Sequence, residues 1–284
     1  MKDKNLYFVG GIVRDEILGA ASFDTDYCYE GDAISFARSK GFNILRENPA
    51  FGTVRIEKDG KEIDIASTRV ETYPKKGHLP KVEKIGCSLK EDVLRRDFTI
   101  NSLYKRTTDG EVIDFTGKGL NDIKEGRITV LHDESFVDDP TRIIRALKFS
   151  VRFGFELDER TRQLQTEYLD NINYDMSYHR VKKELVETFN LNKYKAYERF
   201  ISENIYKLLG ENQESCILSD KVEQFDVIYP WLKYMAFFNL EKFELTRVEK
   251  RILEWAERLK TEAPNNNTPE ESIIIDKIRR ECRC

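Results

Sequence analysis

The sequence contains no long uninterrupted apolar run. None of its hydrophobic stretches approaches the roughly 18 to 20 apolar residues that a helix needs to span a bilayer, and 35% of its 284 residues are charged. The N-terminal segment MKDKNLYFVGG contains charges followed by only a short apolar stretch, so it lacks the regions of a signal peptide. We therefore expect a cytoplasmic protein that is not embedded in a membrane.

Cysteine and histidine are also scarce. The five cysteines include no C-x-x-C pair and the three histidines lie far apart in the sequence, so we expect reduced thiols and no zinc site. A net charge of −4 argues against a general polyanion-binding protein but leaves room for a local basic surface. The charge alone neither identifies nor excludes RNA as a partner.

The first part of the chain alternates short strands and helices, and its length favours more than one domain. The patterns predict strands at LYFV (6–9) and SFDTDYCY (22–29), and helices at 14–18 and DAISFARSKG (32–41). Two alternating runs in VRIEKDGKEIDIA (54–66) meet at Asp59-Gly60, a dipeptide that suits a tight hairpin turn. This order is typical of a fold that mixes strands with helices.

A segment without clear periodicity follows, and then a helix signal. Residues 68–86 contain two prolines, two glycines and four lysines, so we expect a loop there. The run from Ser88 to Glu91 matches a capping box, and apolar residues at helical spacing after it predict one helix that carries RRDFTIN (95–101). A second hairpin is expected around Asp109-Gly110.

Beyond Asp139 nearly all of the sequence predicts helix. Asp139-Pro140 places a carboxylate at the N-cap and proline at the first helical position. Amphipathic stretches predict helices at 180–189, 195–209 and 244–260. After a polar break a further helical pattern begins at 273 and stops with the sequence, so the tail is expected to be short or truncated.

Two carboxylates stand two residues apart at Asp24 and Asp26. In a strand, alternate side chains share one face, so both carboxylates would point the same way. Magnesium prefers oxygen ligands and commonly bridges carboxylates to substrate phosphates. A solvated strand face or a turn explains an isolated D-x-D better, so the neighbouring motif decides between the two interpretations.

That neighbouring motif is the segment from Gly10 to Asp15, which follows a strand and opens a helix. Glycines let backbone N–H groups approach a triphosphate, the start of a helix favours anions, and Arg14 adds a planar fork of donors. A strand-to-helix turn that simply requires glycine is the alternative. Followed by the two aspartates, the motif favours a magnesium-dependent nucleotide site.

Three motifs carry a family resemblance when they are taken in order: GGIVRDEILGAASFDTD, LRRDFTINSL and DDPTRIIRALKFSVRFGFELD. They resemble the class II tRNA nucleotidyltransferases, the family that bacterial CCA-adding enzymes share with bacterial poly(A) polymerases. The likeness runs from residue 6 to 190, and it implies an α+β fold. A polymerase-β-like nucleotidyltransferase head with a mixed sheet (1–135) would precede an all-helical neck (136–190) and body (191–284).

The resemblance also implies an activity. The chain would add CMP and AMP from CTP and ATP to the 3′ end of tRNA without a nucleic-acid template, and would release pyrophosphate. Asp24 and Asp26 fall on the family's metal-binding pair for two Mg²⁺ ions, and Asp64 falls on a third acidic position of the wider superfamily. Asp64 equally fits a half-buried strand, because it alternates with Ile63 and Ile65. No stable protein partner is expected.

The first two motifs would contact the nucleotide. The matching positions in the first are Gly10, Gly11 and Arg14. In the second, Arg96 would reach the triphosphate, whereas Asp97 and Asn101, four residues apart on one helix face, would hydrogen-bond a ribose 2′-hydroxyl. A helix surface with ordinary charge pairs is the alternative for this second motif.

The third motif would read the base. Asp139 and Arg142 match the amino-acid template that recognises the Watson–Crick edge of the incoming base, and Arg145 and Lys148 continue a basic stripe at spacings of three. A helix N-cap alone would also explain Asp139. Asp138 and Lys148 stand where the family usually has Glu and Arg, so a bidentate contact at position 148 would be weaker.

The resemblance leaves open which nucleotides are added: CCA, only CC, only A, or a poly(A) tail. The basic segment 69–86 would supply a movable element that turns the template from CTP to ATP, so we expect full CCA addition. The alternatives are a non-catalytic RNA-binding module that keeps the fold and a nucleotidyltransferase acting on another RNA or on a protein hydroxyl. The intact acidic residues argue against a non-catalytic module, because carboxylates repel one another without a metal.

Overall fold

The computed structural model describes residues 1–22, 25–211, 225 and 227–261. Asp24 and the helical pattern expected from residue 273 lie outside this part of the chain. The chain divides into two compact units, of which the first comprises Met1–Asp139 and Phe155–Leu164 and the second comprises Pro140–Gly154 and the residues from Gln165 onward. The three segments 1–135, 136–190 and 191–284 stay a prediction.

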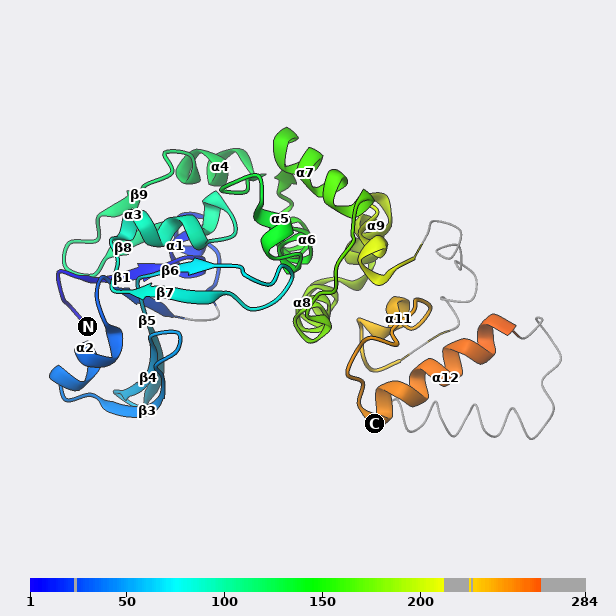
Figure 1. Cartoon of the computed structure of the whole chain (residues 1–284), viewed down its shortest axis with the longest axis horizontal. Coiled ribbons are helices and arrows are strands. Elements are labelled where there is room, and N and C mark those ends of the chain that lie inside the picture. Colours follow the sequence, from blue (N-terminus) through cyan, green and yellow to red (C-terminus); the bar gives the residue numbers. More distant parts are fainter. Residues whose placement is uncertain (23–24, 212–224, 226, 262–284) are drawn as a thin grey trace. The chain divides into compact units, whose positions relative to one another are not determined.

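The first unit is built on a mixed seven-stranded sheet (Figure 1) in the order β3-β4-β5-β2-β1-β8-β9. Its strands are β1 (Leu6–Val9), β2 (Asp26–Tyr29), β3 (Asn43–Asn48), β4 (Thr53–Lys58), β5 (Lys61–Ser67), β8 (Leu103–Arg106) and β9 (Val112–Asp114). The pair β2 and β5 is parallel, and the other neighbouring strands are antiparallel. This sheet confirms the expected mixed-sheet head.

Local turn chemistry forms both expected hairpins. Strands β4 and β5 join through Asp59 (φ 54°) and Gly60 (φ 72°), and both backbone angles are left-handed, as a two-residue hairpin turn requires. Strands β8 and β9 are joined through a turn that contains Gly110 at φ 78°. These elements follow from short-range sequence signals.

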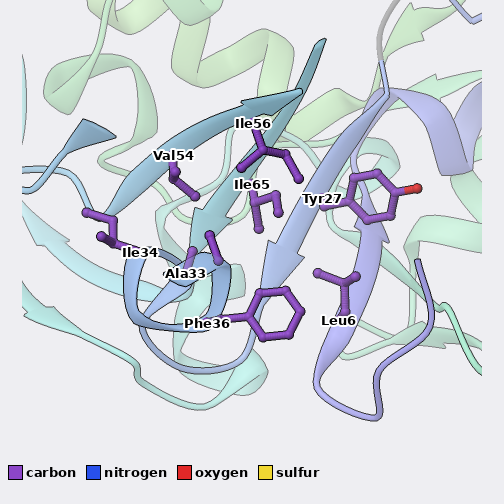
Figure 2. Packing of buried hydrophobic residues seen from close by; sticks show 9 residues of the cluster. Leu6, Tyr27, Ala33, Ile34, Phe36, Val54, Ile56 and Ile65 are labelled. Carbon is purple, nitrogen blue, oxygen red and sulfur yellow. The ribbon is translucent and has the colours of Figure 1, made fainter. Parts of the chain in front are cut away.

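Helix α2 (Ala33–Ser39) covers one face of the sheet. Asp32 caps it by accepting hydrogen bonds from the backbone N–H groups of Ile34 and Ser35 at 2.9 and 3.4 Å. Figure 2 shows the buried side chains between α2 and the strands: Leu6, Tyr27, Ala33, Ile34, Phe36, Val54, Ile56 and Ile65. The apolar side of the helix and the alternating strand residues thus share one core.

That core determines where the acidic strand residues point. Tyr27 and Ile65 face α2, and successive residues of a strand point to opposite faces. Asp26 and Asp64 therefore lie on the other face of the sheet. Buried Cys28 lies on that face too, packed with Tyr7, Val9, Leu89, Val93 and Tyr104.

The segment 68–86, expected to be a loop, contains a second sheet. Strand β6 (Arg69–Thr72) pairs antiparallel with β7 (Lys81–Ile85), and residues 73–80 connect them. The expectation of an irregular segment was therefore wrong for the two strands. Side chains of this ribbon are mostly exposed or half-buried, so its sequence lacks the apolar alternation that indicates a strand.

The expectation that a single helix carries RRDFTIN is wrong as well. The capping box at Ser88 and Glu91 is present, but helix α3 (Leu89–Asp92) passes into a 3₁₀ turn at Val93–Arg95, and a second 3₁₀ turn follows at Thr99–Asn101. Phe98 between them is extended, fully buried and bridged to Val130. Burial of Phe98 thus overrides the local helical pattern.

The strand expected at 22–29 is shorter than predicted, because β2 begins only at Asp26 and Thr25 precedes it. Helix α1 (Gly11–Ile17) opens directly after Gly10, as expected. The remaining elements of the first unit are α4 (Gly119–Glu125), α5 (Ser135–Asp138) and the parallel pair β10 (Arg127–Ile128) and β11 (Glu156–Leu157).

The described part of the second unit is helical, as expected. Its elements are α6 (Thr141–Phe153), α8 (Tyr178–Leu191), α9 (Lys193–Ser202), a 3₁₀ turn (Ile205–Leu209), α11 (Leu232–Met235) and α12 (Arg247–Thr261), and α7 (Glu159–Asp170) ends in this unit. The N-cap position expected for Asp139 is wrong, because Pro140 stands at the N-cap of α6 and Asp139 precedes it with extended backbone angles, which a residue before proline favours. No helix within the described ranges has both the length and the apolarity to cross a membrane.

Candidate nucleotide-binding site

The turn between β1 and α1 has a backbone conformation that requires glycine. Gly10 has φ 70° and ψ −124°, which an L side chain rarely adopts, and its N–H donates to the Leu103 carbonyl at 3.2 Å. A Cβ atom on Gly10 would lie 3.6 Å from the Asn101 carbonyl oxygen and 4.0 Å from Arg96 Nη1. The turn therefore lies against the second sequence motif.

Arg14 joins the first motif to the second through a buried network. Its Nε and Nη2 atoms donate to Asp15 Oδ1 at 2.9 and 2.6 Å, and its Nη1 donates to Asn101 Oδ1. Both members of the Arg14–Asp15 pair are at most 3% exposed. The guanidinium is thus fixed in orientation beside the glycine turn, where a Cβ on Gly11 would lie 3.5 Å from Nη2.

Asp97 and Asn101 extend this network. Asn101 Nδ2 donates to Asp97 Oδ1 and Oδ2 at 3.1 and 3.3 Å, and the Phe98 N–H donates to Asp97 Oδ1 at 2.8 Å. The two side chains meet as the sequence spacing predicted, although no continuous helix joins them. Their proximity arises from the extended backbone at Phe98 and the 3₁₀ turn after it.

Arg96 is held by Asp92 and Tyr104, two residues that sequence reasoning missed. Arg96 Nη2 donates to Asp92 Oδ2 at 2.7 Å and Nε donates to Tyr104 Oη at 3.0 Å. Asp92 is fully buried and also accepts from the Arg69 N–H at 2.9 Å, Arg95 Nε at 2.8 Å and Tyr104 Oη at 2.8 Å. The position of Asp92, three and four residues before two arginines, was the signal that could have revealed it.

In this cluster, neighbouring charged and polar groups shift the pKa values of Asp92 and Arg96 more than burial does. Burial by itself would raise the pKa of Asp92, but Arg96 and Arg95 lower that pKa well below its ordinary value. Burial opposes the charged form of Arg96, whereas Tyr104 and Asp92 raise its pKa. Burial also raises the pKa of the Tyr104 phenol. Asp92 is therefore ionised, and Tyr104 keeps its proton to donate.

Asp26 and Asp64 lie side by side across the parallel strands β2 and β5. Because Phe8 pairs with Tyr27, Asp26 also lies beside the end of β1, where the glycine turn begins. Asp64 accepts hydrogen bonds from Arg55 Nε and Nη2 at 2.8 and 2.7 Å, so both of its oxygens are engaged. The residues that the structure describes contain no group of three or more His, Cys, Asp or Glu arranged to hold a metal ion.

The third motif spans the two units. Asp139 is 5% exposed and ends a segment of the first unit, where Lys76 Nζ donates to Asp138 Oδ1 at 2.5 Å and the Gly77 N–H donates to the Asp138 carbonyl at 3.1 Å. The connection between β6 and β7 therefore contacts the residue before Asp139. This connection is thus held within the first unit by Asp138.

Arg142, Arg145 and Lys148 belong to the second unit, on α6. Arg142 is buried. Arg145 Nη1 donates to Glu184 Oε1 at 3.3 Å, and Lys148 Nζ donates to Glu184 Oε2 at 2.6 Å and to Glu187 Oε2 at 2.8 Å. The far end of the basic stripe thus pairs with carboxylates of α8, and base reading by the stripe stays a prediction.

Most of the first unit resembles a known domain. Residues 6–129 match the poly A polymerase head domain. The A-adding tRNA nucleotidyltransferase of Aquifex aeolicus is 44% identical over 165 residues, which cover 56% of this chain and 20% of that protein. The chain thus spans about a fifth of the length of this curated relative.

Solved structures extend the likeness over most of the chain. A CCA-adding enzyme in an apo form has a TM-score of 0.72 at 28% identity, over 91% of this chain and 67% of that one. A tRNA nucleotidyltransferase in complex with a primer tRNA and an incoming ATP analogue has a TM-score of 0.63 at 27% identity, over 90% of this chain and 79% of that one. Residues 6–129 thus match a poly A polymerase head domain, and the expected resemblance of the chain to tRNA nucleotidyltransferases and poly(A) polymerases is confirmed.

Proposed function

We propose that the chain transfers a nucleoside monophosphate from a nucleoside triphosphate to the 3′ end of tRNA and releases pyrophosphate. The observation that carries this proposal is the convergence of the glycine turn with Arg14, Arg96 and Asn101 beside the strand end that bears Asp26. The names of the relatives, which describe A-adding and CCA-adding enzymes, support the same reaction.

The side chains suit the parts of a ribonucleoside triphosphate. Arg14 and Arg96 place two guanidinium groups by the glycine turn, where they would neutralise phosphate charge. The amide of Asn101 and the carboxylate of Asp97 offer a donor and an acceptor for a ribose hydroxyl, which a deoxyribonucleotide would leave unpaired. Asp139 and Arg142 are proposed to read the base.

Magnesium is the cofactor that we propose, with Asp24 and Asp26 as its ligands. The donor chemistry fits, because an exposed carboxylate at a strand end offers the hard oxygen ligand that Mg²⁺ prefers. Asp64 ranks below this pair as a ligand, since Arg55 donates to both of its oxygens. When bound, Mg²⁺ would neutralise triphosphate charge and favour deprotonation of the primer hydroxyl. A cytoplasmic location stays a prediction.

The choice of nucleotide separates two candidates. Addition of AMP is common to A-adding and CCA-adding enzymes, so it is the first activity to expect, and full CCA addition remains the prediction from the sequence. Addition of A alone is the second candidate, since two A-adding relatives are 44% identical over 165 and 166 residues, whereas a third A-adding relative is 32% identical and the CCA-adding enzyme of Bacillus pumilus is 36% identical.

The test uses two tRNA transcripts, one ending before CCA and one ending in CC, with Mg²⁺ and labelled CTP or ATP supplied separately. Incorporation of C into the first and A into the second indicates CCA addition, whereas A into the second alone indicates an A-adding enzyme. Repeated addition of A indicates poly(A) synthesis. Asp26→Asn should abolish incorporation, and Glu62→Gln, which changes an exposed carboxylate on β5, should not. Failure of the parent protein to incorporate either nucleotide would refute the enzyme proposal.

A further inference from the structure

Arg96 is restrained on three sides. Asp92 holds its Nη2, the Tyr104 hydroxyl holds its Nε, and the Tyr104 ring centroid lies 4.9 Å from the guanidinium carbon. Within the described part of the chain no hydrogen bond engages the third nitrogen, Nη1. This atom lies 4.0 Å from where a Cβ of Gly10 would be, so it faces the glycine turn.

The Tyr104 hydroxyl links Arg96 to Asp92. Its hydroxyl accepts from Arg96 Nε and donates to Asp92 Oδ2, and Arg96 Nη2 donates to the same carboxylate oxygen. The three side chains therefore form a closed ring of hydrogen bonds that leaves the guanidinium little rotational freedom. A long arginine side chain fixed in this way loses less entropy when it binds an anion.

Asp92 lies in a cluster of charged side chains. Arg69, Arg95 and Arg96 meet Asp92 and Glu71 there, and neither carboxylate is more than 4% exposed. Nη1 of Arg96 is the part of this cluster that faces the turn where a triphosphate is expected.

We propose that Asp92 and Tyr104 are positioning residues that direct Arg96 Nη1 to the phosphates of the incoming nucleoside triphosphate. This inference rests on the proposed function, because it takes the glycine turn as the triphosphate site. Asp92 and Tyr104 act through Arg96 and do not contact the nucleotide. They determine the affinity for the triphosphate and not the recognition of the nucleoside.

The first test compares binding of ATP and CTP with binding of the corresponding nucleosides. Tyr104→Phe removes only the hydroxyl and keeps the ring, so ATP and CTP should bind about tenfold more weakly, as loss of a hydrogen bond to a charged group predicts. Nucleoside affinity should not change. Asp92→Asn should weaken triphosphate binding further, and if that variant does not fold, Tyr104→Phe carries the test.

Asp122→Asn is the matched control. Asp122 is another buried carboxylate of the first unit, and it accepts from Thr99 Oγ1 at 2.6 Å and from Arg127 Nε at 3.2 Å. Its loss should lower stability without changing the ratio of triphosphate to nucleoside affinity. A general structural role for Tyr104 would lower both affinities together.

Turnover supplies a second readout. Tyr104→Phe should raise KM for ATP more than it lowers kcat, because a weaker hold on the triphosphate mainly affects binding. Unchanged ATP affinity in Tyr104→Phe, equal losses for ATP and adenosine, or a parent protein that binds no triphosphate would overturn the inference. A parent protein that binds ATP but adds no nucleotide would refute the proposed function alone.

Discussion

The buried pair formed by Arg14 and Asp15 allows the structural and nucleotide-binding roles of Arg14 to be separated. Arg14→Met removes the guanidinium and its hydrogen bonds to Asp15 and Asn101 while keeping much of the side-chain volume. The Asp15 carboxylate then stays buried without its arginine. Breaking one side of such a pair destabilises by about 3 to 5 kcal/mol, a large part of the roughly 5 to 15 kcal/mol that stabilises an ordinary domain.

The double variant Arg14→Met with Asp15→Leu removes both charges together. Replacement of a whole buried pair by apolar residues is often neutral or stabilising, so most of the lost stability should return. Affinity for ATP should not return, because the guanidinium is still missing. Recovery of stability without recovery of binding would separate the two roles.

The assay must report on the first unit. Both tryptophans, Trp231 and Trp255, belong to the second unit, so their fluorescence would follow the wrong part of the chain. Hydrogen exchange of amides in β1 and β5 during urea unfolding is the suitable measurement, with tryptophan fluorescence as an internal control. A loss below about 1 kcal/mol in Arg14→Met, or ATP binding at the parent level in the double variant, would refute the reasoning.

Three further predictions concern the glycine turn, the buried carboxylate of Asp92 and α6, the helix proposed to read the base. Gly10→Ala should destabilise by about 1 to 3 kcal/mol and weaken ATP binding, because φ 70° with ψ −124° strains any L residue, whereas Gly19→Ala (φ 63°, open space) should spare ATP binding in the same titration. The pKa of Asp92 is lower in the folded protein than in the unfolded chain, so the ionised carboxylate stabilises the fold. This contribution is complete above the unfolded pKa of about 3.9 and is lost as the pH falls towards the folded pKa. The stability difference between parent and Asp92→Asn should therefore shrink below about pH 4 in acid titrations followed by circular dichroism, and a constant difference would contradict this. Arg142→Ala should reduce the preference for CTP over UTP more than it weakens triphosphate binding, and an unchanged preference in competition assays would assign Arg142 a structural role.

Short-range chemistry made several elements predictable. The dipeptide Asp59-Gly60 suffices for its hairpin because its left-handed angles depend only on local sterics. The capping box at Ser88 and Glu91 satisfies backbone donors within one turn, so it too is visible in the sequence. By contrast, the ribbon of β6 and β7 buries little apolar surface, and its pairing left no periodic signal.

The sequence by itself indicated the family resemblance and the candidate site residues, since the order of three motifs needs no coordinates. Only the tertiary structure decided how the second motif is arranged. Burial of Phe98 breaks the helix that the local pattern favours, and Asp97 and Asn101 meet across that break. Asp92 acquires its role only from the chain segments that converge on it, because a carboxylate is stable in the interior when donors surround it. Those donors come from positions 69 to 104, and the fold alone brings them together.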